Sequence, residues 1–296
     1  LDVERFSRHF NGAPIIQVEG RTFPVEVRYR PMAEESVQSD EDEGFEQLEE
    51  AMPRAVVNAV EECIEHSRQQ GRAGSGDILV FASTEREIRD LADTLRKYGP
   101  PHTEILPLYA RLSLNEQQRI FHPTGKGRRI IIATNVAETS LTVPNIHYVI
   151  DNGFARISRY SYRSRVQRLP IEAVAQAAAN QRKGRCGRIA AGVCIRLYSE
   201  EDFNSRPEFT EPEIRRTHLA AVILQMNVLG LGNISEFPFI EPPDSRFIND
   251  GVRVLEELGA LDKQQKITSL GQQLSRFPLD PRLARMLVAA AHSACL

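Results

Sequence analysis

The residues best suited to chemistry lie at positions 181–188, in the stretch QRKGRCGR. This stretch holds four cations and two glycines at the end of an alanine-rich run, EAVAQAAAN. Each glycine costs a helix interior about 1 kcal/mol relative to alanine, so helix stability does not explain the composition. At about 100° per residue, Gln181, Arg185 and Arg188 fall within an arc of roughly 60°. Two guanidiniums and an amide on one arc suit an anionic ligand, although the spacing alone equally allows a solvated basic face.

A second basic segment, ARISRYSYRSRVQRLPI, lies at residues 155–171. In a strand or hairpin, alternate side chains point to opposite faces. One face of this segment would be basic and the other would pack against the protein. The basic face would hold Arg159, Arg163 and Arg165, and the packing face Tyr160, Tyr162 and Val166. The segment is therefore a candidate polyanion surface, with a surface hairpin that binds nothing as the alternative.

Composition places the chain among ordinary globular proteins. Its 296 residues are 41% hydrophobic and 26% charged, with a net charge of -3, and they are enough for two domains. No apolar run approaches the roughly 20 residues that span a bilayer, so we expect no membrane partner. The acidic run at 34–50 is expected to be a flexible, solvated loop. The four cysteines have neither metal-ligand nor disulfide spacing, so we expect reduced thiols, a cytoplasmic location and no metal site.

Strands and helices alternate in the first two-thirds of the chain. The apolar runs do not alternate with polar residues, which indicates strands covered on both faces in a parallel, doubly wound sheet. Ligands of such sheets bind at the carboxyl ends of the strands, where Ser83, Asn135 and Asp151 lie. The expected strands are 77–83, 103–110, 128–135, 146–151 and 192–199. The expected helices are 85–99 and 113–121, the second capped by Ser113.

After about residue 200 the pattern becomes helical. A helix is expected over 213–230, with its apolar stripe at Leu219, Val222, Ile223, Met226 and Leu229. A second is expected over 244–262, followed by a turn and strand at KQQKI. This helix–helix–wing order is typical of winged-helix modules, and we expect it to pack internally rather than to read DNA. The expected division is 1–24, 25–199, 200–267 for the winged-helix domain, and 268–296 for the start of another helical domain.

Four long motifs, in this order, resemble the DEAH-box helicases. They are LPLYARLSLNEQQRIF, ATNVAETSLTVPNIHYVID, ANQRKGRCGR and PFIEPPDSRFINDGVRVLEELGALD. The first three are similar to the second RecA-like domain of that family and the last to its winged helix, with the bacterial HrpA type most similar. The phosphate-binding G-x-x-x-x-G-K-[ST] and the D-E-x-H motifs are absent. The resemblance implies that residues 1–24 end a first RecA-like domain, which would hold most of the ATP and Mg²⁺ site.

The resemblance also assigns nucleotide roles to single residues. Arg185 and Arg188 match arginine fingers, and Gln181 matches a contact to the γ-phosphate or to the attacking water. Phe121 matches a ring that stacks on adenine, with a core phenylalanine as the alternative. Asp151 matches a nucleotide-proximal position. Ser140 matches a sensor of the nucleotide state, Arg182 and Lys183 are expected to serve packing or salt bridges, and Asn152 replaces a usual proline and should loosen its turn.

RNA contacts are implied in the same way. Thr139 matches a hydroxyl that holds an RNA phosphate, and Asn135 lies nearby. Read without the family, Thr139 and Ser140 could equally be helix-cap residues. Arg159, Arg163 and Arg165 would contact RNA from a hairpin that separates strands.

The resemblance implies part of an ATP-dependent, 3′-to-5′ RNA helicase that translocates on single-stranded RNA. Its partners would be RNA, the first RecA-like domain, and C-terminal helical and OB-like domains of the same protein. Because two ATP-site motifs are absent, we expect no ATP hydrolysis by this fragment alone. The alternative is a non-enzymatic module that binds RNA or a protein partner.

Overall fold

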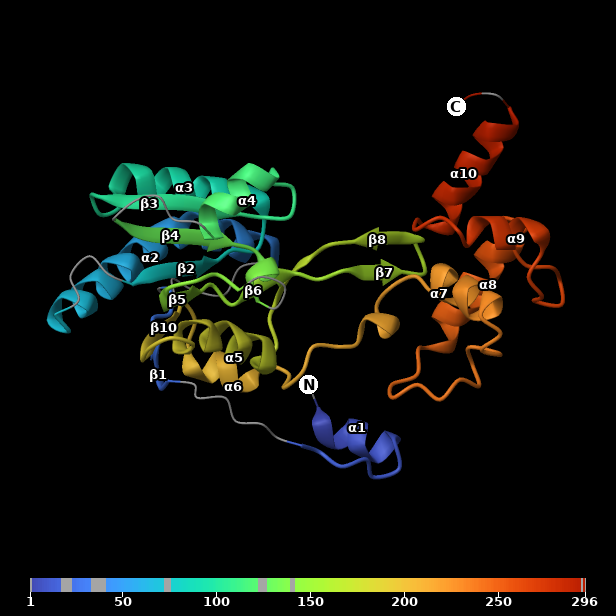
Figure 1. Cartoon of the computed structure of the whole chain (residues 1–296), viewed down its shortest axis with the longest axis horizontal. Coiled ribbons are helices and arrows are strands. Elements are labelled where there is room, and N and C mark those ends of the chain that lie inside the picture. The colour runs from blue at the N-terminus through green and yellow to red at the C-terminus, as the bar shows by residue number, and fades with distance from the viewer. Residues whose placement is uncertain are drawn as a thin grey trace. The chain divides into compact units, whose positions relative to one another are not determined.

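The computed structural model describes residues 2–16, 23–32, 41–71, 76–121, 127–138, 142–293 and 295 (Figure 1). These residues form two compact units. The sheet unit contains residues 16–156 and 171–210, and the helical unit contains residues 2–15, 157–170 and 211–296. The expected boundary near residue 200 thus precedes the observed division by about ten residues, because α6 (Glu200–Ser205) belongs to the sheet unit.

A parallel six-stranded sheet forms the centre of the sheet unit, with strand order β1-β10-β5-β2-β4-β3. The strands are β1 (Val25–Tyr29), β2 (Asp77–Phe81), β3 (Thr103–Leu108), β4 (Arg128–Ala133), β5 (Ile146–Asp151) and β10 (Gly192–Arg196). Every residue of β2, β4 and β10 is buried. The expected doubly covered sheet is therefore confirmed, and β1 is an edge strand that the sequence analysis did not predict.

Each face of this sheet has its own apolar core. Ile78 and Val80 of β2 pack with residues of α2 (Glu41–Gln69) and α3 (Glu85–Tyr98). Leu79 and Phe81 point to the other face, in a core with Ile120 of α4 (Leu114–Phe121). This alternation within one strand is what burial on both faces requires.

Local signals account for the helix boundaries. Thr84 accepts a hydrogen bond from the Glu87 backbone N–H and caps α3, which ends before Gly99. Ser113 and Glu116 bond reciprocally at the start of α4, so the expected cap is confirmed. The expectation of a loop over 34–50 is wrong for residues 41–50, which form the first turns of α2. Residues 34–40 lie outside the described residues.

The helical unit contains five α-helices among the described residues, and its core is a single apolar cluster. Between α8 and α9, Leu261 and Ile267 form one antiparallel bridge, which is all that is present of the expected wing strand. The helix expected over 213–230 is broken into a 3₁₀ turn, η3 (Glu213–Arg215), and α7. Val222 and Leu229 of its expected stripe are 36% and 66% exposed. The helices are α1 (Val3–His9), α7 (Ala220–Val228), α8 (Ser245–Glu257), α9 (Ser269–Leu274) and α10 (Pro281–His292).

One long antiparallel hairpin links the two units. Its base pairs β6 (Phe154–Arg156) with β9 (Ile171–Ala173) in the sheet unit. Its tip pairs β7 (Arg159–Ser161) with β8 (Val166–Arg168) in the helical unit. The hairpin expected over 155–171 is thereby confirmed.

At the amino end of the sheet, a buried ion pair joins β2 to β4. Asp77 Oδ2 accepts hydrogen bonds from Arg129 Nη2 and Nε at 2.5 and 2.9 Å, and both side chains are 3% exposed. Arg129 also donates to the backbone carbonyls of Ile120 and Pro144. The guanidinium therefore ties two strands, the end of α4 and the loop before β5 together.

We expect Asp77→Asn to destabilise the sheet unit by about 3–5 kcal/mol, because it leaves a buried guanidinium without its counter-charge. The matched control is Asp93→Asn, which breaks an exposed pair with Arg96 (2.8 Å, side chains 75% and 54% exposed). This control should cost less than about 1 kcal/mol. Urea unfolding followed by circular dichroism measures both, and equal effects would show that the buried pair is not critical.

Candidate functional site

The cationic stretch at 181–188 lies where one helix changes its geometry. Helix α5 (Gln176–Gly184) ends at Gly184, and a 3₁₀ turn, η2, continues over Arg185–Gly187. The expectation of an uninterrupted α-helix is therefore wrong, because a 3₁₀ turn takes about three residues rather than 3.6. The arc calculated for an α-helix does not describe Arg185 and Arg188.

Arg185 and Arg188 nevertheless reach the same segment, the one that follows β4. Arg185 Nη2 donates to the backbone carbonyl of Glu138, and Arg188 Nη1 donates to Thr142 Oγ1 at 3.0 Å. This segment runs from the carboxyl edge of the sheet, after Ala133 of β4, back to the amino edge, before Ile146 of β5. Arg185, which is buried, thus contacts Glu138, five residues after β4 ends, whereas Arg188, which is exposed, contacts Thr142, four residues before β5 begins. Gly187, beside Arg188, accepts a hydrogen bond from the Phe23 N–H, just before β1, so the structure does not place Arg188 at the expected carboxyl edge.

The electrostatics of this pair favour an anion. Burial lowers the pKa of Arg185, and the nearby charge of Arg188 lowers it further, against a smaller opposing effect of Glu138. A bound anion would relieve both the desolvation and the mutual repulsion of the two guanidiniums. Gln181 is exposed on the last turns of α5.

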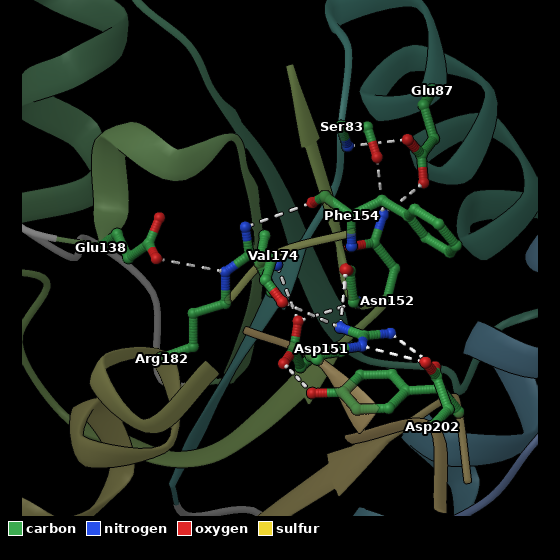
Figure 2. A network of polar contacts seen from close by, with 12 residues as sticks. Ser83, Glu87, Glu138, Asp151, Asn152, Phe154, Val174, Arg182 and Asp202 are labelled. Atoms are coloured by element: carbon green, nitrogen blue, oxygen red, sulfur yellow. Dashed lines mark hydrogen bonds and ion pairs between the residues drawn. The ribbon is translucent and has the colours of Figure 1, made fainter. Parts of the chain in front are cut away.

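Arg182 lies in the centre of a buried polar network (Figure 2). Its side chain has no exposed surface, and its Nη1 donates to Asp151 Oδ1 at 2.7 Å. Its Nη2 donates to the Phe154 carbonyl at 3.2 Å, and the guanidinium lies 4.7 Å from the centre of the Phe81 ring. The expected packing and salt-bridge role of Arg182 is confirmed.

Asp151 is committed to this network on both carboxylate oxygens. Besides Arg182, it accepts hydrogen bonds from the Gly153 N–H at 2.9 Å and from the Tyr198 hydroxyl at 2.8 Å. Burial and then Asp151 raise the pKa of Tyr198, so this hydroxyl remains a donor. Asp151 is 0% exposed, and its assignment to a nucleotide-proximal position stays a prediction. Its contacts hold the end of β5 against α5.

Asn152 holds its turn firmly, although its replacement of a usual proline suggested a looser turn. Its Nδ2 donates to Ser83 Oγ and Glu87 Oε1, each at 3.0 Å, and its Oδ1 accepts from the Phe154 N–H at 3.0 Å. The side chain is buried, and Figure 2 shows it reaching the segment after β2. The expectation of a looser turn is wrong, because two of these bonds tie the turn to Ser83 and Glu87 and the third closes the turn onto Phe154.

The other described residues that are expected to contact nucleotide or RNA lie outside the network around Arg182 and Asp151. Phe121 is the last residue of α4 and packs, partly buried, against the core of one sheet face, as its alternative assignment expects. Stacking of this ring on adenine stays a prediction. Asn135 begins the 3₁₀ turn η1 (Asn135–Ala137) and is exposed, while Thr139 and Ser140 lie outside the described residues.

The hairpin tip does not have the simple basic face that residue parity predicts. The turn at 162–165 separates Arg163 and Arg165 from the strand that holds Arg159, so the three share no strand face. Arg159 pairs with Glu211, and Arg165 lies 3.8 Å from both Asp250 and Glu257.

Arg163 is the exposed cation of this turn. Its guanidinium lies 6.0 Å from the centre of the Tyr162 ring, and no carboxylate of the described residues pairs with it. On the expected packing face, Tyr160 is buried and donates to Asp250 at 2.5 Å, whereas Val166 is 48% exposed. The tip is therefore anchored by Tyr160 and offers Arg163 to an outside partner.

Sequence reasoning missed Glu138 as a partner of Arg182 and Arg185, and Asn152 as a partner of Ser83 and Glu87. Both lie in short polar segments after buried strands, where no periodicity marks which side chain turns inward. The sequence signal that pointed to this region was the position of Asp151 and Asn135 at the carboxyl ends of expected strands. In the part of the chain that the structure describes, no helix has the length and apolarity to cross a membrane.

Two regions match known families. Residues 55–190 match the helicase conserved C-terminal domain, and residues 251–279 match the winged-helix helicase associated domain, HA2. The first match includes the segment after β4 and both arginines that contact it. The second covers most of α8 and all of α9, on either side of the Leu261–Ile267 bridge.

Known helicases are similar over the whole chain. The ATP-dependent RNA helicase HrpA of Escherichia coli (strain K12) is 62% identical over 301 residues, which cover 100% of this chain and 22% of that protein. Human probable ATP-dependent RNA helicase DHX35 is 35% identical over 100% of this chain and 42% of its own length. The crystal structure of the E. coli DEAH/RHA helicase HrpB, 31% identical, superposes with a TM-score of 0.81 over 98% of this chain and 34% of that one. The chain therefore spans a fifth to two-fifths of these relatives, and over the residues it contains it belongs to the DEAH-box helicases of the HrpA type.

Proposed function

We propose that this chain is the part of an ATP-dependent RNA helicase that supplies the arginine fingers and one of the two RNA grips. ATP and Mg²⁺ would be held mainly by a first RecA-like domain outside this chain. The observation that carries the proposal is the pair Arg185 and Arg188, both bonded to the segment between β4 and β5. The named RNA helicases that share its sequence support the choice of RNA.

The finger role follows from the chemistry of phosphoryl transfer. Negative charge shifts toward the leaving oxygen in the transition state, and guanidiniums placed in advance stabilise it without reorganisation. Arg185 is fixed by its bond to the Glu138 carbonyl, and Arg188, three residues later, is exposed. Gln181 would contact the γ-phosphate or the attacking water. Closure of the two RecA-like domains would then depend on the γ-phosphate.

RNA would be held through its phosphates, by Asn135, by Thr139 and by the hairpin tip. Such contacts depend on salt and tolerate most sequences. Opening and closing of the domains would move the RNA in the 3′-to-5′ direction, with the hairpin separating the strands. The chain contains neither the G-x-x-x-x-G-K-[ST] nor the D-E-x-H motif, so by itself it should not hydrolyse ATP.

Arg185→Ala in the full-length helicase should lower RNA-stimulated ATP hydrolysis by about 10³-fold or more, because a finger contributes on this scale. RNA affinity, measured by fluorescence anisotropy, should stay near that of the wild type. The matched control is Arg86→Ala, on α3, whose side chain is 83% exposed beside Asp90. Hydrolysis that survives in the Arg185 variant at the control's level would refute the finger role.

Arg163→Ala should weaken RNA binding and reduce the slope of log K against log salt by about 0.7, the value for one lost single-strand phosphate contact. Arg159→Ala should change the slope less, because Glu211 already pairs with Arg159. Titrations of a single-stranded RNA at several salt concentrations measure both slopes. If the Arg159 variant shows the larger change, RNA must replace Glu211 as the partner of that arginine.

A further inference from the structure

Glu138 lies between a segment that is expected to contact RNA and the helix that precedes the expected arginine fingers. It follows η1, and its N–H donates to the Asn135 carbonyl at 2.9 Å. Asn135, in the same turn, is one of the residues expected to contact RNA. The Glu138 side chain is only 11% exposed and points toward α5 (Figure 2). Glu138 therefore joins an expected RNA segment to the helix that precedes the fingers.

Two different atoms of Glu138 contact two different arginines. Its backbone carbonyl accepts the hydrogen bond of Arg185, the expected finger. Its carboxylate Oε1 lies 3.7 Å from Nε of Arg182. A displacement of Glu138 would consequently change the contacts of both guanidiniums.

The contact with Arg182 is incompletely formed. A distance of 3.7 Å exceeds that of an N–H···O hydrogen bond, about 2.9 Å. Arg182 Nε is buried and has no hydrogen-bond partner among the described residues. Two buried groups of opposite charge thus lie close together without the hydrogen bond that would compensate for their desolvation.

The charge balance around Glu138 agrees with this geometry. Burial raises the pKa of the Glu138 carboxyl, and the charge of Asp151 on β5 adds to the rise. Arg182 on α5 and Arg185 on η2 only partly offset it. The ionised carboxylate is therefore poorly satisfied at its present distance from Arg182.

We propose that Glu138 is a positioning residue, which closes onto Arg182 when RNA engages the segment after β4 and thereby sets the position of Arg185. Closure requires the Oε1 to Nε distance to shorten by roughly 0.8 Å, to a normal hydrogen bond. The same movement carries the carbonyl that holds Arg185. This inference rests on the proposed function, and it assigns the coupling between RNA binding and hydrolysis to one carboxylate.

The test compares wild type with Glu138→Gln in the full-length helicase, with saturating ATP and RNA, from pH 5.5 to 8. Glutamine keeps the shape and removes the charge, so RNA-stimulated kcat at pH 8 should fall by roughly 3- to 30-fold, the range for a coupling residue. The difference should shrink as the pH falls, because the wild-type glutamate with its raised pKa becomes neutral too. Glu138→Asp, one methylene shorter, should fall between the two.

Two controls separate coupling from folding and from general charge effects. Glu104→Gln removes a carboxylate from an exposed pair with Arg119 in the same unit and should leave kcat unchanged. In urea unfolding at pH 8, Glu138→Gln should be no less stable than wild type. A carboxyl whose pKa is raised by folding destabilises the fold once the pH rises through that pKa, and glutamine avoids this.

The outcomes distinguish a coupling role of Glu138 from a structural role and from a failure of the proposed function. Wild-type rates at all pH values in Glu138→Gln would overturn the inference and leave the proposed function intact. A loss of the same factor at every pH would also overturn it, because it would indicate a merely structural role. If the wild type shows no RNA stimulation at all, the proposed function fails first and the inference with it.

Discussion

The complete burial of the Arg182 guanidinium is the constraint on which the rest of the sheet unit depends. A buried charge is tolerated only with opposite charge and hydrogen-bond acceptors around it. Asp151 and the Phe154 carbonyl supply them, so the end of β5 and the start of the hairpin must meet α5 at one point. Arg185 and Arg188 follow three and six residues later, and their contacts with the segment between β4 and β5 depend on this anchor.

The architecture of the sheet explains why polar residues gather at the carboxyl ends of its strands. Strands that are buried on both faces leave polar residues only at their ends, and parallel strands bring those ends to the same side. Ser83, Asn152 and Glu138 all follow strands of this sheet. The bond between Asn152 and Ser83 connects the end of β5 to the end of β2 (Figure 2), and Glu138, after β4, accepts a hydrogen bond from Arg185. A change in one strand end can therefore reach the others.

Much of the sheet unit could be predicted from sequence, because its signals are local and strong. The apolar runs of β2 and β4 and the cap at Ser113 depend on neighbouring residues. The features that the sequence analysis did not predict depend on residues far away in the chain. The 3₁₀ turn at Arg185, the inward turn of Asn152, and the pairing of Arg159 with Glu211 are decided by partners far away in the chain. The start of α2 was missed because its acidic composition resembles that of a solvated loop.

The hairpin has a mechanical consequence, since its base belongs to one compact unit and its tip to the other. A single linker lets two bodies swivel almost freely, whereas a paired ribbon resists torsion through its ladder of backbone bonds. The chain also passes between the units at 15/16 and at 210/211. The units are therefore joined by four chain crossings, two of which, at 156/157 and 170/171, are held side by side by the strand pairs of the hairpin.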